Sequence, residues 1–133
     1  PSVTGSCSHP TGTGIAVVLF GPAITAFLSA IVLLYQALLL AHGGITTLGA
    51  NTASMGIIGP FAGWIVYKFA KRAGLEITTS TFLAAVIADW TTYVVTSLQL
   101  ALAFPAGNGI SGIASSAAVF MGIFAVTQVP IAV

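Results

Sequence analysis

Long apolar segments, separated by short breaks rich in glycine and proline, make up most of this chain. The pattern predicts helices at about residues 22–41, 53–70, 79–104 and 113–133. Each approaches or exceeds the roughly 20 residues that a helix needs to cross the hydrocarbon core of a bilayer. We therefore predict an all-α fold, a polytopic transmembrane helical bundle with about four spanning helices, forming a single membrane domain over residues 1–133.

Residues 13–21 form a shorter apolar stretch that cannot span a membrane as a helix. Two arrangements remain open for it. The stretch re-enters the membrane, or it leads directly across Gly21-Pro22 into the helix that follows. Proline suits the first position of a helix, where its missing N–H has no partner to lose.

Polar residues recur at helical spacing inside the apolar segments. Thr25, Ser29 and Gln36 fall on one face of segment 22–41. A second stripe, in segment 79–104, consists of Asp89, Thr92, Thr96 and Gln99. Because lipid offers no hydrogen bonds, we expect both stripes and Asn51 to face neighbouring helices. An acid such as Asp89 inside a membrane segment could bind a cation, relay protons or hydrogen-bond to another helix, and the adjacent Thr92 favours the last.

Small residues in segment 53–70 predict close packing against another helix. Gly59 and Gly63 form a small-xxx-small pattern, and Gly56 lies one turn earlier. Pro60 is expected to kink this helix, because it removes a hydrogen bond and its ring meets the preceding turn.

Charged residues are only 4% of the chain, against about 25% in soluble domains. The charged positions are Lys68, Lys71, Arg72, Glu76 and Asp89. We expect a multi-pass integral protein of the cell membrane that contacts membrane lipid. The net charge of +1 is too small for a nucleic-acid surface. Trp64 and Tyr67 precede the basic cluster, as is typical of the membrane interface.

The loop at residues 5–14 carries the strongest candidate for metal chemistry. It contains Cys7 and His9, and the second histidine is His42. Imidazole suits nickel, cobalt, copper and zinc, but these three side chains and the buried Asp89 are a poor set for a four-ligand zinc site. The alternative for His9 is an ordinary histidine in a loop at the membrane surface. For His42 we prefer a structural role, in which the imidazole interacts with the carbonyl end of a helix. Phosphate-loop and hydrolase motifs are absent from the sequence, so an enzyme is not predicted.

Several stretches resemble one family in order along almost the whole chain. They are residues 6–14 (SCSHPTGTG), 35–51 (YQALLLAHGGITTLGAN), 55–60 (MGIIGP), 91–105 and 124–130. They are similar to the cobalt/nickel substrate-capture subunits (CbiM/NikM family) of energy-coupling-factor transporters, which are associated with cobalamin biosynthesis. The resemblance implies capture of Co²⁺ or Ni²⁺ for import, without a resident cofactor. It also implies a transmembrane coupling subunit and cytoplasmic ATPase subunits as partners, with ATP hydrolysis in those partners.

The resemblance also assigns residues. His9 matches the family's loop ligand, which binds the metal together with the terminal amine and the second-position histidine of a Met-His start. That start has no counterpart here, so we expect the chain to be the middle part of a longer subunit, truncated at both ends. Five further residues are expected to support the site, namely Cys7, His42, Gly43, Gly44 and Asn51. The alternative from a different class is a non-transporting structural subunit of a larger membrane complex.

Overall fold

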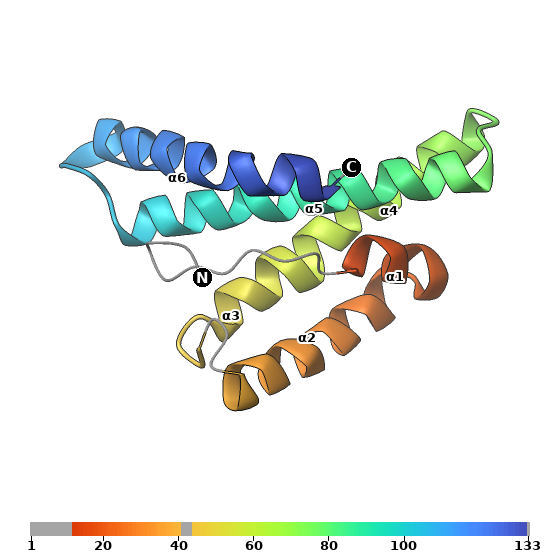
Figure 1. The fold of residues 1–133 in the computed structure, drawn as a ribbon, viewed down its shortest axis with the longest axis horizontal. Coiled ribbons are helices and arrows are strands. Elements are labelled where there is room, and N and C mark those ends of the chain that lie inside the picture. The colour runs from red at the N-terminus through yellow and green to blue at the C-terminus, as the bar shows by residue number, and fades with distance from the viewer. Residues whose placement is uncertain (1–11, 41–43, 133) are drawn as a thin grey trace.

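The computed structural model describes residues 12–40 and 44–132, and this part of the chain is helical without strands. The elements in order are α1 (Thr13–Phe20), α2 (Pro22–Leu39), α3 (Leu48–Asn51), the π-helix η1 (Thr52–Ile58), α4 (Gly59–Arg72), α5 (Ile77–Ala103) and α6 (Gly109–Ala132). The long helices α5 and α6 lie side by side, and α4 packs against α5 (Figure 1). The predicted all-α bundle is confirmed.

Three helices in the described ranges, α2, α5 and α6, are long and apolar enough to cross a membrane. They correspond to three of the predicted segments, with ends that shift by up to four residues. The remaining segment was predicted to begin at residue 53, after a turn, and this boundary is wrong. Residues Leu48–Asn51 are already helical and run directly into η1 and α4. The fourth predicted segment is therefore a composite of three helical pieces.

The short apolar stretch forms a helix of its own, α1, of 8 residues. It does not continue straight into α2, because Gly21 between them adopts φ 79° and ψ 169°. Only glycine takes up this backbone conformation without strain. Pro22 then occupies the start of α2, as expected. At about 1.5 Å per residue α1 is only about 12 Å long, and it doubles back into α2 instead of spanning (Figure 1).

The irregularity expected at Pro60 takes the form of a wider helix just before it. The Gly59 N–H donates to the Ser54 carbonyl, five residues earlier, as in a π-helix. The proline ring cannot fit against the carbonyl four residues before it in a regular α-helix. Widening the turn ahead of Pro60 relieves this contact and lets α4 begin with the proline in its first turn.

Small and hydroxyl-bearing side chains form the helix contacts, and large apolar side chains face outward. Ala84, Ala101, Ser80 and Ser97 are fully buried. Exposed large residues cover the outer surface of every long helix, among them Phe27, Leu39, Phe69, Leu102 and Val126. This arrangement is typical of a bundle in lipid, where helix association depends on close backbone approach and not on burying bulky apolar groups.

Two residues of the polar stripe of α5, Thr92 and Gln99, face the composite helix. The Thr92 hydroxyl donates to the Ser54 carbonyl at 3.3 Å, and Gln99 Nε2 donates to the Ala50 carbonyl at 3.3 Å. Both acceptors lie in or just before η1. Side chains from α5 thus supply hydrogen bonds to the carbonyls of the irregular helix, which is tolerated at membrane depth only with such partners.

Two aromatic side chains make contacts at the middle of the α5–α6 pair and at the end of α4. Between α5 and α6 the Tyr93 hydroxyl donates to the Met121 carbonyl, and its ring meets Phe124 edge-on at 5.5 Å. At the end of α4 the Lys68 ammonium lies 3.9 Å from the centre of the Trp64 ring. This cation–π contact agrees with the membrane interface predicted there.

Candidate metal-capture site

Four of the residues predicted for the metal site, Cys7, His9, His42 and Gly43, lie outside the described residues. The structure does describe the end of the predicted metal loop, and it corrects the loop's boundary. Thr13 and Gly14 belong to α1, so the loop ends at Gly12. What the structure contributes to the site is the frame in which this loop end is held.

Gly12 marks the point where the loop enters the bundle. It adopts the left-handed conformation, with φ 67°, and its carbonyl accepts hydrogen bonds from the Ile15 and Ala16 amides at 3.2 and 3.0 Å. Two residues further on, a side-chain carbon on Gly14 would lie 2.6 Å from the Ala85 Cα. Glycine at this position therefore lets α1 touch the backbone of α5, which fixes the loop end against a spanning helix.

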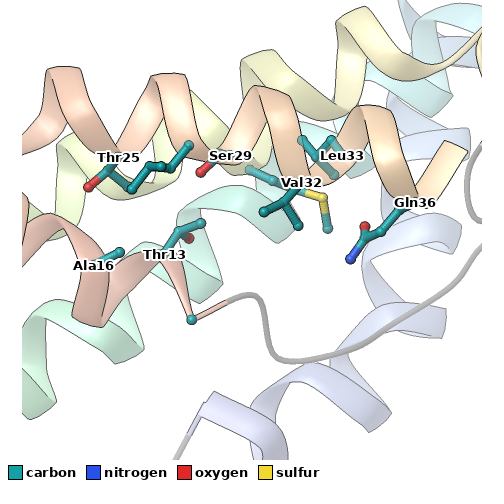
Figure 2. Close-up of a pocket in the computed structure, with 10 residues that line it drawn as sticks. Thr13, Ala16, Thr25, Ser29, Val32, Leu33 and Gln36 are labelled. Carbon is teal, nitrogen blue, oxygen red and sulfur yellow. The ribbon is translucent and has the colours of Figure 1, made fainter.

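Two cavities flank Gly12. The first, of about 170 Å³, lies between α1, α2 and η1, and its lining includes Thr13, Thr25, Gln36 and Met55 (Figure 2). The second, of about 160 Å³, lies between α1, α5 and the end of α6. Its lining includes Gly14, Asp89 and Ile131. The loop end is thus bordered by neutral polar groups on one side and by a carboxylate on the other.

The described frame does not by itself supply a transition-metal site. Within residues 12–40 and 44–132 no three His, Cys, Asp or Glu side chains come together. Asp89 offers a carboxylate, and the α2 side offers hydroxyl and amide oxygens and the Met55 thioether. Cobalt and nickel prefer nitrogen ligands in proteins, whereas these described groups offer oxygen and sulfur donors.

Of the described residues proposed as site support, Gly44 lies in the turn that precedes α3, and Asn51 is the last residue of α3. Gly44 adopts φ 73°, and its carbonyl accepts the Thr47 hydroxyl at 3.3 Å. The backbone N–H of Asn51 donates to the Thr47 carbonyl at 2.9 Å. Neither Gly44 nor Asn51 lines the two cavities beside Gly12. Their supporting role therefore stays a prediction.

The sequence pattern predicts a helix contact for Gln36, whereas the structure places this residue at the first cavity, with its Oε1 atom buried and without a partner among the described residues. Met55, which carries no signal in the sequence pattern, lines the same cavity from η1. The spacing of Thr25, Ser29 and Gln36 identified the correct face of α2. It could not reveal the cavity, because the space depends on how α1 packs across that face.

The described helices define the class of this molecule as a multi-pass membrane protein. The chain belongs to the CbiM family, since the family model described as the cobalt uptake substrate-specific transmembrane region matches residues 1–133. A CbiM protein of Archaeoglobus fulgidus is 73% identical over the whole chain, which covers 60% of that relative. The cobalt transport protein CbiM of Salmonella typhimurium is 59% identical over the whole chain, which covers 54% of it. The chain thus spans little more than half of these relatives' length.

Solved structures share the fold. A structure described as a transition metal transporter superposes with a TM-score of 0.80 at 24% identity, covering 96% of this chain and 61% of that one. A structure described as a truncated transition metal transporter gives a TM-score of 0.69 at 25% identity, covering 96% of this chain and 64% of that one.

Proposed function

We propose that this chain is part of the substrate-capture subunit of an ATP-driven, energy-coupling-factor importer for Co²⁺ or Ni²⁺. Membership of the CbiM family supports this proposal, as do relatives whose names describe cobalt transport. The chain itself carries out no catalysis. A transmembrane coupling subunit and cytoplasmic ATPase subunits supply the energy.

The structural observation that supports the proposal most is the anchored end of the histidine-containing loop. His9 precedes Gly12 by three residues, a length of chain that reaches at most about 10 Å. Gly12 in turn is fixed because Gly14 packs directly on Ala85 of α5. In this proposal His9 is a metal ligand, and the helices restrict where its imidazole can go. Restricting a ligand before binding reduces the entropy lost on capture.

The alternative, a structural subunit without transport, predicts glycine-rich helix faces that remain available for partner subunits. The described glycines of α4 argue against it. Gly59 and Gly63 face Ala84 and Ala88 of α5, where an added side-chain carbon would lie within 3 Å of their atoms. These small residues are used inside the chain and not for assembly with other subunits.

Calorimetric titration of the purified full-length protein with Co²⁺, Ni²⁺ and Mg²⁺ tests the proposal. We expect tight binding of Co²⁺ or Ni²⁺ and none of Mg²⁺, since nitrogen ligands discriminate against magnesium. Equal, weak binding of all three ions would refute metal capture and favour the structural alternative. Metal uptake by vesicles holding the assembled complex, with and without ATP, tests the coupling.

Replacing Asn51 with leucine tests the proposed supporting role of this residue at the end of α3. Asn51 is half-buried at the end of α3. Its backbone N–H and backbone carbonyl already have hydrogen-bond partners, so the substitution changes only the side chain. If its side chain braces the metal site, the substitution weakens Co²⁺ or Ni²⁺ binding about 10- to 100-fold, as for other groups behind metal ligands. The melting temperature then changes little. Parallel losses of affinity and stability would show that Asn51 serves only the fold.

A further inference from the structure

The positive charge of the chain is concentrated where α4 turns into α5, at one end of the molecule (Figure 1). Lys68, Lys71 and Arg72 are the only lysine and arginine residues of the sequence, and all three lie near the end of α4 with exposed side chains. We call residues 68–77 the basic tip. It also contains one acid, Glu76, so three cations and one anion give it a net charge of +2.

The end of α4 closes its own hydrogen bonds without these side chains. Gly74 adopts φ 84° and turns the chain out of the helix. The backbone N–H groups of residues 73–75 donate to the carbonyls of residues 69–71, at 2.9 to 3.2 Å. Basic side chains can serve as partners for the last carbonyls of a helix, but backbone groups already fill that role here. The exposed Lys71 and Arg72 can therefore bind an anion from outside the chain.

The basic tip also exposes large apolar side chains. Phe69 is 64% exposed, Leu75 40% and Ile77 61%. The Lys68 ammonium lies 3.9 Å from the centre of the Trp64 ring, and tryptophan is enriched at the depth of the lipid headgroups. The tip thus combines positive charge with apolar surface at the membrane interface. A free phosphate ion would match the charge but would leave the apolar side chains in water, whereas a phospholipid matches both.

We propose that the basic tip binds an anionic phospholipid, with Lys71 and Arg72 holding the headgroup phosphate. The planar guanidinium of arginine can donate two hydrogen bonds to one phosphate, and the lysine ammonium adds a point charge. The acyl chains then lie against the exposed apolar residues Phe69, Leu75 and Ile77. Because anionic lipids are enriched in the cytoplasmic leaflet, this binding places the basic tip on the cytoplasmic side and fixes the depth of the α4–α5 hairpin in the membrane.

Native mass spectrometry of the full-length protein tests this site. The protein is released from nanodiscs that contain phosphatidylcholine and phosphatidylglycerol in a 3:1 ratio with identical acyl chains, and the retained lipids are counted. We expect phosphatidylglycerol to be retained several-fold above its share. A lysine or arginine near an anionic surface raises lipid affinity about fivefold. Lys71→Gln/Arg72→Gln should therefore lower the relative affinity for phosphatidylglycerol at least about fivefold, with an unchanged circular dichroism spectrum.

Two matched variants separate headgroup binding from a structural role of the same residues. The exchange Lys71→Arg/Arg72→Lys keeps the charge and should keep the preference for phosphatidylglycerol. Glu76→Gln removes the only acid of the basic tip and should strengthen the preference, opposite in sign to the loss of the cations. A preference that is absent from the native protein, or unchanged in Lys71→Gln/Arg72→Gln, would overturn the proposal.

Two further measurements distinguish the lipid from other anionic partners of the basic tip. Inorganic phosphate is added at constant ionic strength, and we expect it not to displace phosphatidylglycerol. Displacement would show a site for free anions and would overturn the proposal. Loss of the preference when the partner subunits of the transporter are bound would assign the tip to a protein partner and would also overturn it. None of these measurements involves Co²⁺ or Ni²⁺, so their failure is distinct from a failure of metal capture.

Discussion

Replacing His9 with alanine in the full-length protein is expected to abolish high-affinity capture of Co²⁺ and Ni²⁺ while the bundle still assembles. The imidazole is the metal ligand that this chain contributes in the proposed site, and alanine offers no donor atom. Removing groups that only support metal ligands commonly weakens affinity about 10- to 100-fold. Removing a ligand itself should therefore cost at least about 100-fold, as measured by calorimetric titration.

Assembly should survive this substitution, because the described helices hold together by contacts that do not involve His9. The polar bonds from α5 to the composite helix are one such set. Size-exclusion chromatography and circular dichroism should therefore match the native protein. His42→Ala serves as the comparison, and we expect it to weaken binding less than His9→Ala does. Native affinity in His9→Ala would remove His9 from the site, and equal losses in both variants would assign both histidines to it.

The sequence predicted the long helices well because their physical cause is local. About 20 consecutive apolar residues fit a bilayer only as a helix, so α2, α5 and α6 follow from composition and length. The segment before η1 was predicted wrongly for a non-local reason. Gly49 and Asn51 are typical of turns, but Gln99 of α5 donates to the Ala50 carbonyl and so stabilises a helical backbone there. That contact joins residues 49 positions apart and leaves no local signal.

One part of the candidate site can be predicted from local sequence, and another part depends on how the helices pack. The histidine loop was proposed from its residues and their resemblance to a family, since Cys7 and His9 stand out in a chain with few such side chains, and this proposal stays a prediction. The cavities beside Gly12 could not be predicted. They depend on the reversal of the chain at Gly21 and on the contact between Gly14 and Ala85, which set where α1 crosses α2 and α5.

The contact between α4 and α5 leads to the second large prediction, that Gly59→Ala strongly destabilises the bundle. A side-chain carbon at Gly59 would lie 1.9 Å from the Thr92 hydroxyl and 2.8 Å from the Ala88 carbonyl oxygen. These are the two ends of a buried hydrogen bond, which Thr92 donates to Ala88 at 2.8 Å. The added methyl group must push α4 from α5 or displace the Thr92 hydroxyl, whose single proton is shared between the Ala88 carbonyl and the more distant Ser54 carbonyl of η1. Overpacking and a broken buried bond together cost about 3 kcal/mol.

Thermal unfolding of the full-length protein in detergent measures this cost, and we expect a melting temperature lower by about 10 °C. Gly122→Ala in α6 is the matched control, because nothing lies within 4 Å of an added carbon there. Alanine at that position should leave stability unchanged or raise it by up to about 1 kcal/mol, since glycine is the poorer helix former. In the double variant Gly59→Ala/Thr92→Ala the closest clash disappears, so part of the loss should be recovered. If the Gly59→Ala and Gly122→Ala variants have the same melting temperature, then α4 and α5 are not packed as closely as described. The π-helix would then lose its proposed support from α5.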